Sequence, residues 1–199
     1  MSRSGWIQTY TGRQVFPLAP RREDIAIEDI AHALALSNRF TGHTRLAYSV
    51  AQHSVHVSQL VPVEDALWGL LHDASEAYLV DVPSPLKRLA PFAGYRACEA
   101  HLQRVIYHRF GLCGPQPASV HEADRRMLAA EAQDLLGPLH PDWPESCRGM
   151  RGRPSFRVVP WSAEEAERAF LRRFAGLYRA SDEGGVGGRV AVESGGVVG

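Results

Sequence analysis

The segment from Leu70 to Tyr78 combines an apolar helical pattern with three ionisable side chains, and this combination limits what the chain can fold into. Leucine and alanine recur there at helical spacing without an interrupting Gly or Pro, so the segment predicts a helix. His72 and Asp73 precede Glu76 by four and three residues, which brings the three groups onto one surface of that helix. Such a cluster is either a solvated helix face or a metal site with a proton-transfer group one turn away.

Two further ionisable residues, His53 and Asp124, interrupt the apolar stripes of two other predicted helices. A buried carboxylate without a partner is costly, so Asp124 requires a cation, which could be a neighbouring arginine or a metal. His53 could equally be a core histidine whose hydrogen bonds are satisfied. A single metal ion with two imidazole and two carboxylate ligands would satisfy all four groups: His53, His72, Asp73 and Asp124.

Hydrophobic periodicity predicts a mainly all-α fold of about six helices with a small N-terminal β-hairpin. Aromatic and β-branched residues around a Gly turn predict the hairpin within residues 6–18. The predicted helices span about residues 27–37, 48–61, 63–78, 92–110, 118–136 and 162–178. Ser162 and Glu165 have the spacing of a capping box for the last helix. The segment Phe156–Val159 contains aromatic and β-branched residues and predicts a short strand, which could pair with the hairpin.

Composition narrows the class of protein. A length of 199 residues with 45% hydrophobic content predicts one domain, residues 1–180, followed by a disordered glycine-rich tail, residues 181–199. A formal net charge of zero gives no field that favours a nucleic acid polymer or a membrane surface. Cys98, Cys113 and Cys147 are odd in number and widely spaced, which is typical of free thiols in a reducing cytoplasm.

Several motifs together resemble those of a known superfamily. The matching segments are Asn38-Arg39-Phe40, Ser49–Ser54 with His53, His72-Asp73-Ala74-Ser75-Glu76, Asp81–Lys87, and Asp124. They resemble the HD-domain phosphohydrolases and, within these, bacterial 5'-deoxynucleotidases and phage dATP triphosphohydrolases. The resemblance covers about residues 27–135 and implies an HD-domain helical bundle. The segments Tyr10–Gly12 and Gly42-His43 are similar to the phage branch.

The resemblance also implies roles for the site residues. His53, His72, Asp73 and Asp124 would hold one divalent transition metal, Co²⁺, Mn²⁺ or Zn²⁺, or Mg²⁺ if the substrate is a triphosphate. The ion would acidify a water molecule and polarise a phosphoryl oxygen. Glu76 would orient that water or pass a proton to the leaving 5'-oxygen.

Four residues would bind the substrate, a small-molecule deoxynucleotide. Arg39 would hold phosphate oxygens, Lys87 would add a second positive charge, and Asp81 would accept a hydrogen bond from the sugar 3'-hydroxyl. Phe40 stands where the deoxynucleotidases have a tryptophan that crowds the sugar 2'-carbon. The family implies a homo-oligomer. The four tryptophans are scattered along the chain and are interpreted as packing residues.

The expected reaction is hydrolysis of a deoxynucleoside monophosphate to deoxynucleoside and phosphate. The alternatives are a dATP or dNTP triphosphohydrolase that releases intact triphosphate, a hydrolase of guanosine alarmones, and a non-catalytic nucleotide-binding module. Glu76 favours an enzyme, because a pure binding module does not require a proton-handling group. His43 and His56 are weaker site candidates: His43 as a residue that lines the site, and His56 as a ligand of a second metal.

Overall fold

Apolar side chains at helical spacing form helices throughout the computed structural model, which describes residues 5–148 and 154–184. The longer helices are α1 (Ile27–Leu36), α2 (Val50–Leu60), α3 (Ala66–Leu71), α6 (Ala93–Arg109), α7 (Ala118–Leu135) and α9 (Ala163–Gly184). Single turns of α-helix are α4 (Glu76–Leu79), α5 (Ser84–Lys87) and α8 (Glu145–Arg148). Short 3₁₀ turns are η1 (Arg22–Asp24), η2 (Arg39–Gly42), η3 (Val63–Asp65) and η4 (Ala90–Phe92).

A two-stranded antiparallel hairpin precedes the helices. Strand β1 (Ile7–Gln8) pairs with β2 (Gln14–Val15), and Ile7 lies opposite Val15. The turn of the hairpin is tied to α1, because the backbone N–H of Thr11 donates to Asp29 Oδ1 at 2.7 Å. The prediction of a mainly α-helical chain with a small N-terminal β-hairpin is therefore confirmed.

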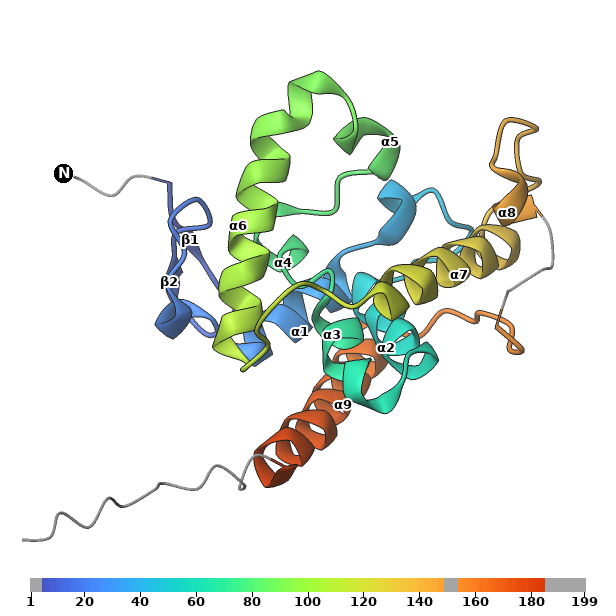
Figure 1. Cartoon of the computed structure of the whole chain (residues 1–199). Coiled ribbons are helices and arrows are strands. Elements are labelled where there is room, and N and C mark those ends of the chain that lie inside the picture. The colour runs from blue at the N-terminus through green and yellow to red at the C-terminus, as the bar shows by residue number, and fades with distance from the viewer. Residues whose placement is uncertain (1–4, 149–153, 185–199) are drawn as a thin grey trace, which may run out of the picture.

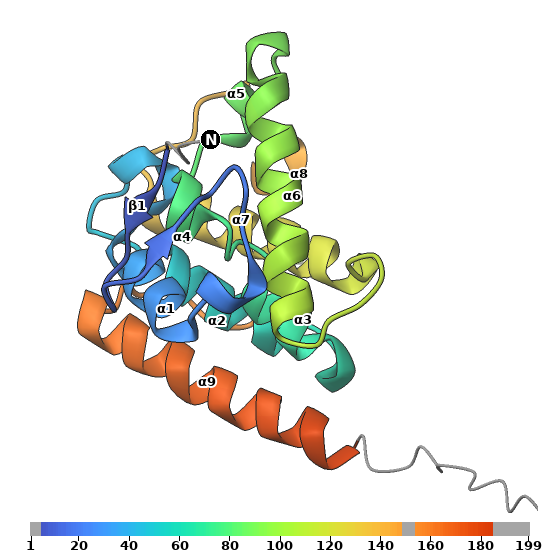
Figure 2. The same ribbon diagram turned by 90° about the vertical axis from the view of Figure 1, so that its left-hand side faces the viewer.

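Helix α2 lies at the centre of the arrangement, since its residues from Val50 to Ser58 are all buried. Helix α9 lies across α1, α2 and α3 on one side (Figure 2), and α7 packs against α2 (Figure 1). The core around α2 includes side chains with no exposed surface: Leu34, Val57, Leu70, Met127 and Phe170. A helix enclosed on all sides places its polar residues inside the protein, and His53 is one of them.

The predicted helix over residues 63–78 is wrong, because it is broken between His72 and Ser75. A side chain of α6 causes the break. Gln103 Oε1 accepts the backbone N–H of Ser75 at 2.9 Å, and Gln103 Nε2 donates to the backbone oxygen of Leu71 at 2.6 Å. These are the two groups that would bond to each other in a continuous helix, so the amide replaces that bond and α3 ends at Leu71.

The predicted strand over Phe156–Val159 is also wrong, because side chains bind its backbone groups instead. The N–H of Val158 donates to Asp134 Oδ2 at 2.8 Å, and Gln52 Nε2 donates to the oxygen of Val159 at 2.8 Å. The segment therefore lies against α7 and α2 without pairing with the hairpin.

The predicted capping box of α9 is present. The N–H of Glu165 donates to Ser162 Oγ at 3.2 Å, and the N–H of Ser162 donates to Glu165 Oε2 at 2.9 Å. Helix α9 continues to Gly184, beyond the predicted end at Tyr178. The rest of the predicted tail, residues 185–199, lies outside the described residues. Among the helices that are described, none has the length and apolar character needed to cross a membrane.

A glycine allows the close crossing of α2 and α3. A Cβ atom at Gly69 would lie 3.0 Å from the Cα of Ser58 and 3.3 Å from Val61 Cγ2. We expect Gly69→Ala to lower the free energy of unfolding by about 1–2 kcal/mol, because overpacking costs about 1–3 kcal/mol and the better helix propensity of alanine offsets about 1 kcal/mol. Urea unfolding measures the change.

The matched control is Gly176→Ala in α9, where an added Cβ meets nothing within 4 Å. This substitution should raise the free energy of unfolding by up to about 1 kcal/mol, since only helix propensity changes. Equal effects of the two substitutions would contradict a close helix crossing at Gly69.

Candidate metal centre

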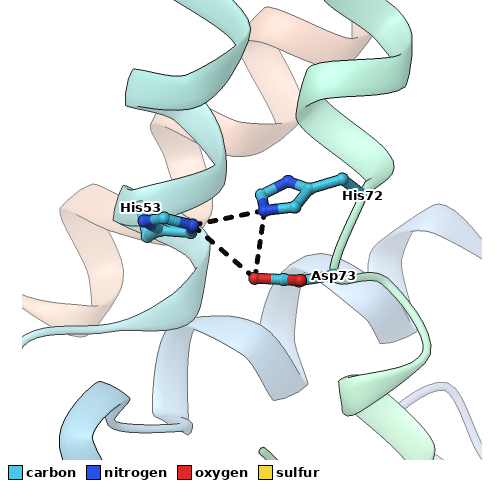
Figure 3. Close-up of side chains that lie close together, drawn as sticks. All are labelled: His53, His72 and Asp73. Atoms are coloured by element: carbon cyan, nitrogen blue, oxygen red, sulfur yellow. Dashed lines mark hydrogen bonds and ion pairs between the residues drawn. The ribbon is translucent and has the colours of Figure 1, made fainter. Parts of the chain in front are cut away.

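Two imidazoles and a carboxylate from α2 and the end of α3 point at one another (Figure 3). His53 Nε2 lies 3.2 Å from His72 Nε2 and 3.6 Å from Asp73 Oδ2, and His72 Nε2 lies 3.2 Å from the same carboxylate oxygen. His53 comes from the buried centre of α2, whereas His72 and Asp73 belong to the turn that follows α3. Three ligand atoms at these distances could hold a metal ion.

The fourth predicted ligand, Asp124 on α7, also reaches the cluster. Its Oδ1 lies 3.2 Å from His53 Nε2 and 4.0 Å from His72 Nε2. The Asp124 side chain is 41% exposed, however, whereas His53 has no exposed surface. Asp124 therefore stands at the edge of the apolar face of α7, and the cluster lies where the core meets solvent.

The Nδ1 atoms of both histidines form hydrogen bonds outside the cluster, and these bonds determine which tautomer each ring adopts and how its Nε2 can bind. His72 Nδ1 lies 2.8 Å from the backbone oxygen of Gly69, a group that only accepts, so Nδ1 carries a hydrogen. His53 Nδ1 lies 2.6 Å from the carboxylate oxygen Glu131 Oε1 and donates to it. In the neutral rings both Nε2 atoms then have a lone pair directed into the cluster, as metal-ligating histidines require. The residues therefore fit a metal ion.

Glu131 is a site residue that the sequence interpretation missed. It lies on α7 seven residues after Asp124, which is two helical turns along the same face. The side chain has no exposed surface and accepts from three groups: His53 Nδ1 at 2.6 Å, Tyr48 Oη at 2.8 Å and Arg39 Nε at 3.0 Å. The spacing of seven residues from Asp124 was the available signal in the sequence. Alanine is common on exposed as well as buried helix faces, so the alanines around Glu131 did not indicate that it is buried.

Arg39 connects this buried carboxylate to the metal cluster. While its Nε donates to Glu131, its Nη1 lies 3.6 Å from Asp73 Oδ2. Its guanidinium also lies over the ring of Phe40, 5.7 Å from the centroid. The backbone of η2 is unusual here, because Phe40 and Thr41 have φ angles of 53° and 54°. Non-glycine residues adopt this conformation at a cost, and such strain is typical of functional sites.

The charges of the cluster shift the pKa values of its members. Burial disfavours the charged form of His72, but the adjacent Asp73 carboxylate outweighs burial and raises the pKa of His72 to about 9. Asp124 is only partly buried; this partial burial opposes its ionisation, yet its contacts with His53 lower its pKa to about 2. Glu131 is fully buried, which also opposes ionisation, but Arg39 and His53 lower its pKa to about 2. The carboxylates are thus ionised and attract positive charge to the cluster.

The predicted catalytic residue Glu76 is buried beside the predicted substrate residue Lys87. Glu76 Oε1 accepts from Lys87 Nζ at 3.2 Å, and Lys87 Nζ also donates to Glu99 Oε1 at 2.6 Å. Glu76 Oε2 is buried and has no hydrogen-bond partner among the described residues. Burial, together with the charges of Asp73 and Asp81, raises the pKa of Glu76 well above its usual value. Lys87 is therefore held by the carboxyl groups of Glu76 and Glu99.

A cavity of about 640 Å³, a size typical of small-molecule sites, is connected to the cluster through Arg39, which lines it and contacts Asp73; the four predicted metal ligands and Glu76 are not among its lining residues. Three of the predicted substrate residues line it, namely Arg39, Phe40 and Asp81. Lys87 is not among the lining residues, but its neighbour Arg88 is. The remaining walls come from α7 and from the segment after it, which includes Trp143.

The two weaker histidine candidates differ in their surroundings. His43 lines the same cavity as Arg39. His56 lies one turn after His53, and its ring packs against Phe156 and Trp161, with each pair of centroids 5.0 Å apart. Its Nε2 lies 3.3 Å from Gln52 Nε2. These contacts give His56 a packing role at the junction of α2 with the segment before α9.

We expect Asp124→Ala and His53→Ala to lose bound metal, because each removes one of the ligand atoms that converge on the cluster. Metal content after dialysis against Co²⁺ or Mn²⁺, measured by mass spectrometry, checks this. The matched control is Glu122→Ala on the same helix, whose carboxylate is exposed and pairs with Arg125. Full metal occupancy in Asp124→Ala would show that Asp124 is not a ligand.

Two known proteins are similar to this chain over most of its length. YfdR of Escherichia coli K12 is 40% identical over 172 residues, which cover 86% of this chain and 95% of YfdR. RCAP_rcc00048 of Rhodobacter capsulatus is 36% identical over 148 residues, which cover 68% of this chain and 75% of that protein. Both are described as uncharacterised, and no family model matches the chain. The chain belongs to the same protein family as YfdR.

Proposed function

We propose that the protein is a metal-dependent phosphohydrolase that cleaves the 5' phosphoester of deoxynucleotides. The observation that carries the proposal is the position of Arg39, which lines the cavity and lies 3.6 Å from Asp73 in the candidate metal centre. A phosphate bound by this guanidinium would be next to the metal ligands. The motifs that resemble HD-domain phosphohydrolases include both residues.

The ligand set suits a divalent transition metal. His53, His72, Asp73 and Asp124 supply two imidazole nitrogens and two carboxylate oxygens, a mixture that Co²⁺, Mn²⁺ and Zn²⁺ accept. When bound, such an ion supplies a water of lowered pKa and polarises a phosphoryl oxygen.

Arg39 positions the phosphate in this scheme. A guanidinium has five N–H donors, so its bond to Glu131 and its contact with Asp73 leave donors for phosphoryl oxygens. Because Glu131 fixes the guanidinium through Nε, little side-chain entropy is lost when a phosphate binds. Asp81, which lines the same cavity, would accept a hydrogen bond from the sugar 3'-hydroxyl.

Glu76 would carry the proton. Its raised pKa favours the protonated acid, which can donate to the leaving 5'-oxygen as the phosphoester bond breaks. Lys87, 3.2 Å away, would stabilise the carboxylate that remains after the transfer. A non-catalytic nucleotide-binding module does not require a buried glutamate paired with a lysine. The buried pair of Glu76 and Lys87 therefore favours an enzyme.

A second candidate is a deoxynucleoside triphosphohydrolase that releases intact triphosphate. The observation in its favour is Arg88, which adds a second guanidinium to the lining of the cavity. A triphosphate carries more charge than a monophosphate and requires more cations near the site. We favour the monophosphate, because Lys87 is held by Glu76 and Glu99 and is not among the residues that line the cavity.

Product analysis tests both candidates. Purified protein is incubated separately with dAMP and dATP in Co²⁺ or Mn²⁺, and the products are separated by anion exchange. Deoxyadenosine and phosphate from dAMP are the expected result. Intact triphosphate from dATP, with dAMP untouched, would select the second candidate. Pyrophosphate and dAMP from dATP would contradict both, since the 5'-oxygen would then not be the leaving group.

We expect Glu76→Gln to keep its metal and to bind nucleotide, but to lose turnover by roughly a hundredfold, because an amide cannot transfer the proton. Metal content and single-turnover rates measured on one preparation separate binding from chemistry. Glu64→Gln, at an exposed position of η3, is the control. A wild-type rate in Glu76→Gln would assign the proton transfer to another group.

A further inference from the structure

We propose that the segment after α7 forms a nucleobase subsite, in which Trp143 stacks on the base of the bound nucleotide. The inference rests on the proposed function and extends it to a part of the chain outside the motifs discussed above. Residues of this segment, including His140, Trp143 and Cys147, line the same cavity as Arg39. The cavity therefore extends from the phosphate-binding residue to an aromatic wall.

The order of residues along α7 indicates how a nucleotide would lie. Asp124 belongs to the metal cluster, Leu128 lines the cavity one turn later, and Leu136, just after the end of the helix, lines it again. The helix from Asp124 to its end at Leu135 rises by about 17 Å, so the cavity wall leads away from the metal ligands along α7. A phosphate beside Arg39 would leave the base in the part of the cavity formed by Trp143.

The chemistry of this part of the cavity suits a planar base. Trp143 is half-buried, so its ring is partly open to the cavity, and Phe40 lines the same space. Leu128, Leu136 and buried Cys147 add apolar surface. Stacking of a base on an aromatic side chain is worth about 1–3 kcal/mol and tolerates any base.

Hydrogen bonds hold the aromatic wall in place against α7. Gln133 Nε2 donates to the backbone oxygen of Cys147 at 2.9 Å, which attaches α8 to α7. The backbone N–H of Trp143 donates to the oxygen of His140 at 3.0 Å. A stacking residue on an ordered segment loses less entropy when the ligand binds than one on a free loop.

A second cavity of about 500 Å³, lined by Trp161, Gln59 and Arg172, does not compete for this role. It lies between α2 and α9 and shares no lining residue with the cavity beside Arg39. A nucleotide whose phosphate is bound by Arg39 therefore has Trp143, and not Trp161, within its cavity.

The test compares a nucleotide with a substrate that has no base. In the wild type, kcat/KM for dAMP should exceed kcat/KM for 2-deoxyribose 5-phosphate, and Trp143→Ala should reduce this ratio by about five- to hundredfold. Trp143→Phe should keep most of the ratio, because a phenyl ring still stacks. An unchanged ratio in Trp143→Ala, with hydrolysis intact, would overturn the subsite and leave the proposed function standing.

Binding provides a readout that does not depend on turnover. Addition of dAMP to the metal-loaded protein should quench tryptophan fluorescence, and Trp143→Phe should remove the quenching. Trp6→Phe, at a half-exposed position before the hairpin, is the matched control and should retain it. Quenching by dAMP without hydrolysis of either substrate would overturn the phosphohydrolase and support the subsite. Quenching that persists in Trp143→Phe would overturn the subsite, even if Trp143→Ala does not fold.

Discussion

The candidate site depends on one buried carboxylate, Glu131. It is fully enclosed, and a buried carboxylate is tolerated only when charged or polar donors surround it. Here the donors come from three places in the chain: Arg39 in η2, Tyr48 just before α2, and His53 within α2. The same contacts that stabilise the charge therefore fix α7 relative to α2 and orient two site residues. Removing the carboxylate would leave Arg39 and His53 without their shared partner in the protein interior.

The balance of charge around Glu131 explains why the cluster attracts a cation. Glu131, Asp73 and Asp124 are carboxylates, and Arg39 is the guanidinium in contact with two of them. With both imidazoles neutral, this group of side chains has a net charge of minus two. Without a metal ion, protons supply part of the missing positive charge, and the neighbouring carboxylates raise the pKa of His72 to about 9. A divalent cation balances the same charge while both imidazoles act as neutral ligands.

Local sequence patterns predicted most of the helices, because apolar spacing and capping act within a few residues. The closeness of His53, His72, Asp73 and Asp124 was also predictable, since His53 and Asp124 interrupt apolar stripes and share a partner type with the adjacent pair His72-Asp73, although Asp124 is more exposed than its stripe suggested. What the sequence did not predict depends on contacts between distant residues.

Glu131 and Trp143 illustrate this limit. The position of Glu131 in α7 shows nothing about its bonds to Arg39 and Tyr48, which are more than eighty residues away in the chain. Trp143 was interpreted as a packing residue because nothing near it in the sequence marks a cavity. Its place in the wall of the cavity that Arg39 also lines depends on how the segment after α7 folds back on that helix.

The break after α3 is the clearest case in which a long-range contact shapes the site. His72 keeps helical backbone angles at the end of α3, with φ −63° and ψ −31°, and Asp73 follows it in the turn. In the turn, His72 Nε2 and Asp73 Oδ2 lie 3.2 Å apart, and both lie within 3.6 Å of His53 Nε2. The break exists because Gln103 takes the two backbone groups that would otherwise bond to each other. Helix α6 contributes no predicted ligand, yet through Gln103 it binds the backbone on both sides of the His72-Asp73 pair.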